Sequence, residues 1–283
     1  MRQGSLVLFA LAAIVCSAHQ FWVQPARFRV APGERVEVSL LVGDGFPGES
    51  RARKPSHVRS FFAHTPDGRV EIEGAEGADP AGAFVAGGRG VITLVYESNA
   101  SGIELGGAQF EAYLREEGLE HVIELRAAAG ESDRPGREAY SRVAKALVLV
   151  GEDPGAFAAW SEPLALPIEL VPETNPYAMA DKGRFRVRLL RDGVPAPGVL
   201  VKALRRNADA LEAHDAAHNA GEDHSHAAWQ SARTDELGVA ELVLDGPGQW
   251  LLAAVMMERV SDNPAHDWRS LWASLTFELA PGE

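Results

Sequence analysis

Histidines are the residues of this 283-residue chain whose type and spacing best predict chemistry. Neutral imidazole binds zinc, copper, nickel and cobalt, and nearby carboxylates raise the affinity of such a site for cations. Motifs for other chemistry are absent from the sequence: it has no phosphate-binding loop, dinucleotide fingerprint or serine-hydrolase motif, and its one cysteine is Cys16. We therefore expect a divalent transition-metal-binding protein that is not an enzyme.

His19 is the first candidate ligand because of the segment that precedes it. Residues 1–18 combine a basic start at Arg2, an apolar run from Leu6 to Val15 and small residues up to Ala18, which is typical of a cleaved export signal. Cleavage after Ala18 would place the protein in the periplasm or outside the cell, with His19 at its amino terminus. The amine and imidazole of a terminal histidine can chelate a metal in a five- or six-membered ring. The alternative is that the cut falls before a histidine by chance, or elsewhere.

The remaining candidate ligands lie far from His19 in the sequence. His64 lies beside a turn, His121 opens a short helix near Glu117 and Glu120, and His266 precedes the last strand. We expect one or two of these histidines to complete the site, and the alternative for each is an ordinary surface or hydrogen-bonded residue. A polar loop at 207–231 carries a second, weaker group that is typical of metal capture or, alternatively, of an inert solvated loop: His214, His218, His224 and His226.

Charge and cysteine content exclude several classes of partner. The net charge is −13, and removal of residues 1–18 takes away one arginine and no acid, which leaves −14. Such a balance argues against binding to nucleic acid or an anionic membrane. The mature chain would have no thiol, which excludes disulfides and thiolate metal sites. The apolar run of the leader is too short to span a membrane, and we expect no membrane span in the mature chain.

The periodicity of apolar residues predicts a mainly β protein with two β-sandwich domains, at 19–170 and 171–283. In the first, strands are expected within 28–42, 58–63, 70–73, 91–96 and 141–150, and Thr65-Pro66-Asp67-Gly68 predicts a hairpin. Helical spacing near 108–129, broken by Gly118, predicts an insertion of two short helices. The long strand at 141–150 places Lys145 among apolar side chains. A charged series enters this strand, for which a buried ion-pair network is the expected explanation and an anion site the alternative: Arg137, Glu138, Arg142 and Lys145.

The second domain shows the same alternation. Phe185, Val187 and Leu189 precede an Asp192-Gly193 turn, and alternation resumes at 199–203, which predicts a second hairpin. Further strands are expected at 168–171, 239–244, 250–255 and 271–279. The domain is thus predicted to be an all-β sandwich of the immunoglobulin-like or transthyretin-like kind.

Several segments of the chain resemble a known family. They are residues 18–25 around His19, Arg137-Glu138-Ala139-Tyr140-Ser141-Arg142 with 145–147, Asn175-Pro176-Tyr177, and the run 267–277 from Asp267-Trp268 to Phe277. Together they look like a largely uncharacterised family of exported bacterial proteins, the NikM-like periplasmic components of cobalt and nickel uptake. The resemblance implies β-sandwich domains, nickel or cobalt as the metal, a membrane metal transporter as partner, and a ligand role for His19. Copper or zinc would suit the same ligands.

Two other classes of function stay open. Copper-dependent polysaccharide monooxygenases also hold their metal with a terminal histidine on a β-sandwich, but they need a second histidine at the metal. A module that binds carbohydrate or protein, with incidental histidines, is the other alternative. The relative positions of His19, His64, His121 and His266 discriminate among these classes.

Overall fold

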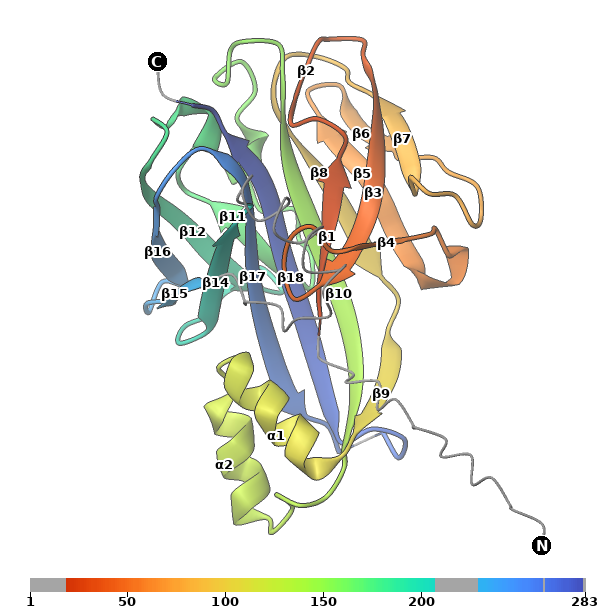
Figure 1. Ribbon diagram of the computed structural model, residues 1–283, viewed down its shortest axis with the longest axis vertical. Coiled ribbons are helices and arrows are strands. Elements are labelled where there is room, and N and C mark those ends of the chain that lie inside the picture. Colours follow the sequence, from red (N-terminus) through yellow and green to blue (C-terminus); the bar gives the residue numbers. More distant parts are fainter. Residues whose placement is uncertain (1–18, 207–228, 262, 282–283) are drawn as a thin grey trace, which may run out of the picture.

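The computed structural model describes residues 19–206, 229–261 and 263–281. In this part of the chain the fold is mainly β, as the sequence predicts, with three sheets and a pair of short helices. Figure 1 shows the sheets as two lobes on either side of a pair of long central strands, with the helices at one end. Three short 3-10 turns lie at Pro55–His57, Ala159–Ser161 and Pro176–Ala178.

A ten-stranded central sheet runs through both lobes. Its strands, in spatial order, are β15 (Gln230–Arg233), β14 (Leu200–Arg205), β17 (Gly248–Arg259), β18 (Trp268–Leu279), β10 (Gly136–Val150), β8 (Gly90–Ser98), β5 (Val58–Thr65) and β6 (Gly68–Glu71), with β2 (Arg29–Val30) and β9 (Ser101–Leu105) also paired to β10.

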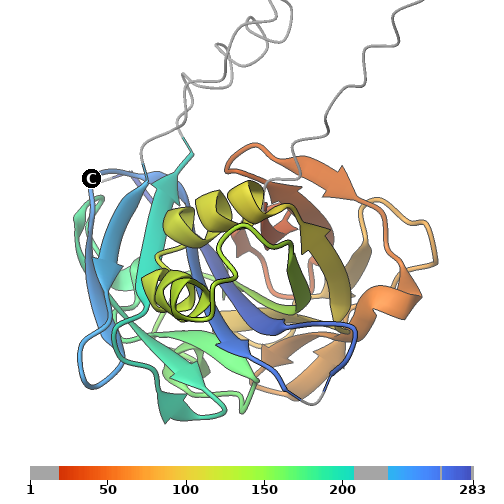
Figure 2. The ribbon, with the colours of Figure 1, turned by 90° about the horizontal axis from the view of Figure 1, so that it is seen from below.

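Two smaller sheets cover this central sheet. The N-terminal sheet contains β1 (Gln20–Pro25), β3 (Arg35–Gly43), β4 (Glu49–Arg51) and β7 (Gly82–Val85). The C-terminal sheet contains β11 (Ile168–Pro172), β12 (Gly183–Arg191), β13 (Val194–Pro195) and β16 (Val239–Leu244). The view in Figure 2 shows the resulting two β-sandwiches side by side.

Strand β10 explains how one sheet serves two cores. Successive side chains of a strand point to opposite faces. Val143 and Leu147 accordingly pack in the core under the C-terminal sheet, whereas Ala144 and Val148 pack in the core under the N-terminal sheet. Both faces of β10 are covered. Its second half is therefore apolar at every position except Lys145.

Parallel pairing of β10 with β18 joins the two sandwiches. The register runs from Glu138 opposite Trp268 to Ala146 opposite Thr276. The hydrogen bonds of the central sheet therefore cross from the N-terminal half of the chain to the C-terminal half. The domain division near residue 170 stays a prediction, and the structure shows two sandwiches that share a sheet.

Most elements lie where apolar alternation predicts them. The 65–68 hairpin is confirmed, with Thr65 opposite Gly68, and so are the two helices, α1 (Gly107–Glu116) and α2 (Glu120–Ala128). The second predicted hairpin is wrong in its pairing. β12 turns into the short β13, and β14 lies in the central sheet against β15 and β17. The alternation is the same in both arrangements because β12 and β14 face the same core from opposite sheets.

The helical pair packs against the end of the central sheet. Phe110 and Leu114 of α1 form an apolar cluster with Trp268 and Trp272 of β18. Gly118, between the helices, has a positive φ of 68° and lies against Leu200 of β14. Glu120 of α2 forms an ion pair with Arg233 at 2.7 Å. The insertion is thus attached to β14 and β15 as well as to β18.

Candidate functional site

His19 lies at the start of the described chain, where its imidazole contacts a carboxylate. The His19 Nδ1 atom is 2.8 Å from Oδ1 of Asp44, and the two side chains are 37% and 46% exposed. An imidazole and a carboxylate at this distance, both reachable from solvent, are two of the ligand types that divalent transition metals accept. We call this pair the His19 site.

Close packing of the 43–48 turn holds Asp44 in position. A Cβ on Gly45 would lie 2.4 Å from Cδ2 of Leu204, and one on Gly48 would lie 2.3 Å from the Trp22 ring. A Cβ at Gly45 would require Leu204 to shift, whereas Gly48 meets the rigid Trp22 ring and has a positive φ of 70°, a combination that glycine permits. The turn is therefore fitted between β1 and β14, and Asp44 projects from it towards His19.

Trp229 connects the His19 site to the C-terminal half of the chain. Its indole Nε1 donates a hydrogen bond to the Asp44 carbonyl at 3.2 Å. In the sequence, Trp229 stands three residues after His226. The histidine-rich run itself lies outside the described residues.

A buried ion pair lies beneath the site. The Glu117 carboxylate accepts hydrogen bonds from Gln20 Nε2 at 3.0 Å and from Lys202 Nζ at 2.8 Å, and all three residues are buried. Burial raises the pKa of Glu117, although Lys202 opposes the shift. Lys202 Nζ also lies 5.3 Å from the centre of the Trp229 ring. This Glu117 cluster therefore supports both the residue after His19 and the residue that contacts Asp44.

Arg142 of β10 approaches the site from the central sheet. Its guanidinium donates to the His19 carbonyl at 3.3 Å and lies over the rings of Tyr140 and Phe21, at 4.8 and 5.4 Å. Burial lowers the pKa of Arg142, yet a guanidinium keeps its charge in proteins. A permanent positive charge thus lies beside the backbone of His19.

The other predicted ligands have different partners. The His64 ring packs 5.7 Å from the Phe157 ring. His121 Nε2 is 3.0 Å from the Met257 carbonyl, and His266 lies over Gly102, with its Nδ1 buried and without a hydrogen bond. Across residues 19–206, 229–261 and 263–281, no three His, Cys, Asp or Glu side chains are grouped closely enough to hold a metal ion. His214, His218, His224 and His226 lie outside these residues.

The sequence did not single out Asp44 or Trp229 as part of the site, and it did not indicate that Glu117 is buried. For Glu117 a signal existed: it follows Phe110 and Leu114 on the apolar stripe of α1, where an acid needs a buried partner. Asp44 lies between Gly43 and Gly45, which predict a turn and nothing about its partner. No local pattern distinguishes Trp229.

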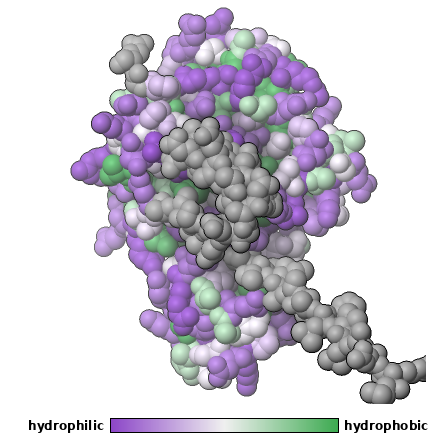
Figure 3. Space-filling view, viewed as in Figure 1, coloured by the Kyte–Doolittle hydropathy of each residue, from purple (hydrophilic) through white to green (hydrophobic). Residues whose placement is uncertain are grey.

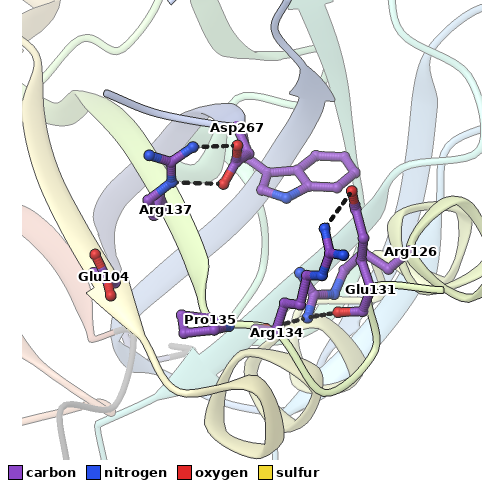
Figure 4. Close-up of a pocket in the computed structure, with 8 residues that line it drawn as sticks. Glu104, Arg126, Glu131, Arg134, Pro135, Arg137 and Asp267 are labelled. Carbon is purple, nitrogen blue, oxygen red and sulfur yellow. Dashed lines mark hydrogen bonds and ion pairs between the residues drawn. The ribbon is translucent and has the colours of Figure 1, made fainter. Parts of the chain in front are cut away.

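A polar cavity of about 260 Å³ lies at the end of the molecule near the helices. Figure 4 shows Arg137 and Asp267 in its lining, joined by a two-pronged ion pair. Hydrogen bonding from Arg137 holds the pKa of Asp267 below its usual value. Arg126, also in the lining, donates to Glu111 and to three backbone carbonyls. These lining charges are satisfied within the protein, and none of the predicted metal ligands lines the cavity.

The chain matches one family model over residues 16–258, described as a domain of unknown function, DUF4198. The chain belongs to this family. No curated protein matches it. In the described part of this DUF4198 chain, no helix has the length and apolar character needed to cross a membrane.

Solved structures that resemble the DUF4198 chain have low TM-scores. The D0-D1 domain of Intimin is 12% identical, with 90% of this chain and 96% of that one covered and a TM-score of 0.20. A mutant of Salmonella alpha-2-macroglobulin is 16% identical over 91% of this chain and 14% of that one, also at 0.20. The tandem V-type regions of VCBP3, a chitin-binding protein, are 8% identical over 89% and 98%, again at 0.20.

The segments on which the resemblance in sequence rests have structural roles in this DUF4198 chain. The 137–147 and 267–277 segments are the paired strands β10 and β18, and Arg137 binds Asp267 across them. Tyr177 donates through its hydroxyl to the Leu147 carbonyl at 2.7 Å. These segments hold the two sandwiches together, whereas the segment around His19 leads to the candidate site.

Proposed function

We propose that this DUF4198 protein binds a divalent transition metal at the His19 site, as a non-catalytic periplasmic or secreted protein. The observation that carries the proposal is the 2.8 Å contact between His19 Nδ1 and Asp44 on a partly exposed corner. If export processing leaves His19 at the amino terminus, its free amine adds a third donor. The site would then offer two nitrogens and one oxygen, with positions open for further ligands.

Two features of the surroundings support a binding role for this corner. The Glu117 carboxylate binds Gln20, the residue after His19, and Lys202, whose Nζ lies against the Trp229 ring, so the chain on both sides of the site is held in place. The histidine-rich run ends in the sequence three residues before Trp229, whose indole donates to the Asp44 carbonyl. We propose that this run raises the local metal concentration and supplies ligands at the open positions.

Nickel or cobalt is the metal favoured by the resemblance to NikM-like uptake components, and delivery to a membrane metal transporter is the proposed role. Copper and zinc also suit a site of two nitrogens and a carboxylate. An oxidative copper enzyme would need a second histidine at the metal, and among the described residues the ring partner of His19 is Asp44.

A carbohydrate- or protein-binding module is the second candidate, because His64, His121 and His266 each have a separate structural contact. The exposed face in Figure 3 is largely hydrophilic where it is coloured, so such a module would bind a polar partner there. Metal titration separates this candidate from the first.

The deciding experiment is calorimetric titration of nickel into protein that begins at His19. We expect about one nickel ion per chain. His19→Ala should lower the nickel affinity by more than about 100-fold, which is a larger loss than removal of a residue that only supports a ligand would cause. A matched control retains Ala18 before His19, which moves the amine and leaves every side chain in place. Equal nickel binding by the wild type and His19→Ala would eliminate the His19 site. Mass measurement of the exported protein tests the cut after Ala18.

A further inference from the structure

We propose that Arg142 binds a small carboxylate beside the His19 site, so that the metal is taken up as a complex with a carboxylic acid. This inference rests on the proposed function and adds the class of the metal's partner ligand. Figure 1 shows β10, which carries Arg142, passing behind the start of β1.

Arg142 is partly buried and has no carboxylate in contact with it. The buried cations each have one within 3.1 Å: Lys145 with Glu169, Lys202 with Glu117, and Arg126 with Glu111. Among the described residues no carboxylate lies within ion-pair distance of Arg142. Its guanidinium donates one hydrogen bond, to the His19 carbonyl, and its Nε atom is buried without a partner. An unpaired cation removed from water is costly, which favours an anion at this position.

The neighbouring acid on β10 is engaged elsewhere. Glu138 lies on the same face of the strand, four residues away, which corresponds to about 13 Å along a strand. It accepts hydrogen bonds from the hydroxyls of Tyr113 and Ser270. Glu138 therefore acts on Arg142 only as a nearby charge, which raises the pKa of the guanidinium without a direct contact. A ligand from solution can supply the contacting carboxylate that Arg142 lacks.

A carboxylate fits the chemistry of the surroundings. A planar guanidinium presents paired donors that match the two oxygens of a carboxylate. The guanidinium carbon lies over the Phe21 and Tyr140 rings, and its Nε is a donor without a hydrogen-bond partner. Since Arg142 already contacts the His19 carbonyl, a carboxylate bound there lies within reach of a metal at His19. In a metal carboxylate complex, the carboxylic acid would coordinate the metal and also form the ion pair that Arg142 lacks.

The test is nickel titration with malonate, a small dicarboxylate, and with chloride at equal ionic strength. For the wild type we expect malonate to raise the apparent nickel affinity at least about tenfold, the effect of a charged hydrogen-bonded contact. Arg142→Met keeps the length and the apolar contacts of the side chain and should abolish the malonate effect. Arg184→Met, which removes an exposed arginine from β12, is the charge-matched control and should retain it.

The outcomes separate this inference from the proposed function. Nickel binding that is the same in malonate and chloride, or the same malonate effect in Arg142→Met, overturns the inference and leaves metal binding at His19 intact. Absence of nickel binding in both buffers overturns the proposed function itself. If Arg142→Met does not fold, Arg142→Lys keeps the charge without the paired donors, and an unchanged malonate effect in that variant also overturns the inference.

Discussion

Replacement of Lys145 by methionine should strongly destabilise the protein. Lys145 is 1% exposed and Glu169 is fully buried, with Nζ and Oε2 3.0 Å apart inside the core under the C-terminal sheet. Lys145→Met keeps the volume and leaves an unpaired carboxylate, and loss of one partner of a buried pair costs about 3–5 kcal/mol. The backbone amides of Leu164 and Leu166 still donate to Glu169. We therefore expect the lower end, about 3 kcal/mol.

The assay is urea unfolding at neutral pH, read as a lower midpoint at an unchanged slope. The double variant Lys145→Met with Glu169→Gln removes the uncompensated charge and keeps an acceptor for the two amides, so it should be more stable than the Lys145→Met single variant. Arg184→Met breaks an exposed pair and should change the free energy of unfolding by less than about 0.5 kcal/mol. A loss below about 1 kcal/mol in Lys145→Met, or a double variant no better than the single, would refute the reasoning.

Two further predictions concern buried and strained positions. Burial raises the pKa of Glu138 above 4.5. The contribution of protonated Glu138 to the free energy of unfolding is therefore complete below pH 4.5 and is lost as the pH rises through the folded-state pKa. Glu138→Gln should therefore gain stability relative to the wild type towards neutral pH, in urea unfolding measured across the range; a constant difference at all pH values would contradict this. Gly118→Ala should cost about 2 kcal/mol or more, since φ is positive and Leu200 lies 2.8 Å from the new Cβ. Gly130→Ala has a similar φ and open space, so it should cost only about 1 kcal/mol in the same assay.

Local patterns predicted the elements because burial imposes its period on the sequence. In β3 the buried positions alternate from Val36 to Val42, and the Thr65–Gly68 turn fixed the pairing of β5 with β6. The helices were predicted from their spacing and from Gly118. These signals extend over a few residues, and each describes one element and its nearest neighbour.

Pairing between distant segments had no such signal. β12 and β14 alternate as a hairpin would, and only their membership of different sheets shows that they are not one. The parallel register of β10 with β18 joins residues about 130 positions apart, for example Arg137 and Asp267. Charge and periodicity describe each strand, but not the strand beside it.

The same limit determines what could be known of the site. His19 could be singled out from the leader-like pattern of residues 1–18, because a predicted cleavage position is a property of the sequence. Its neighbours come from a turn after β3, from the end of α1 and from Trp229. His64, His121 and His266 were predicted as partners from their residue type. In the structure each instead contacts a ring or the backbone of a nearby segment, at Phe157, Met257 and Gly102 respectively. A metal site at His19 therefore depends on a carboxylate that residue type alone could not single out, and substitution of Asp44 tests it as directly as substitution of His19.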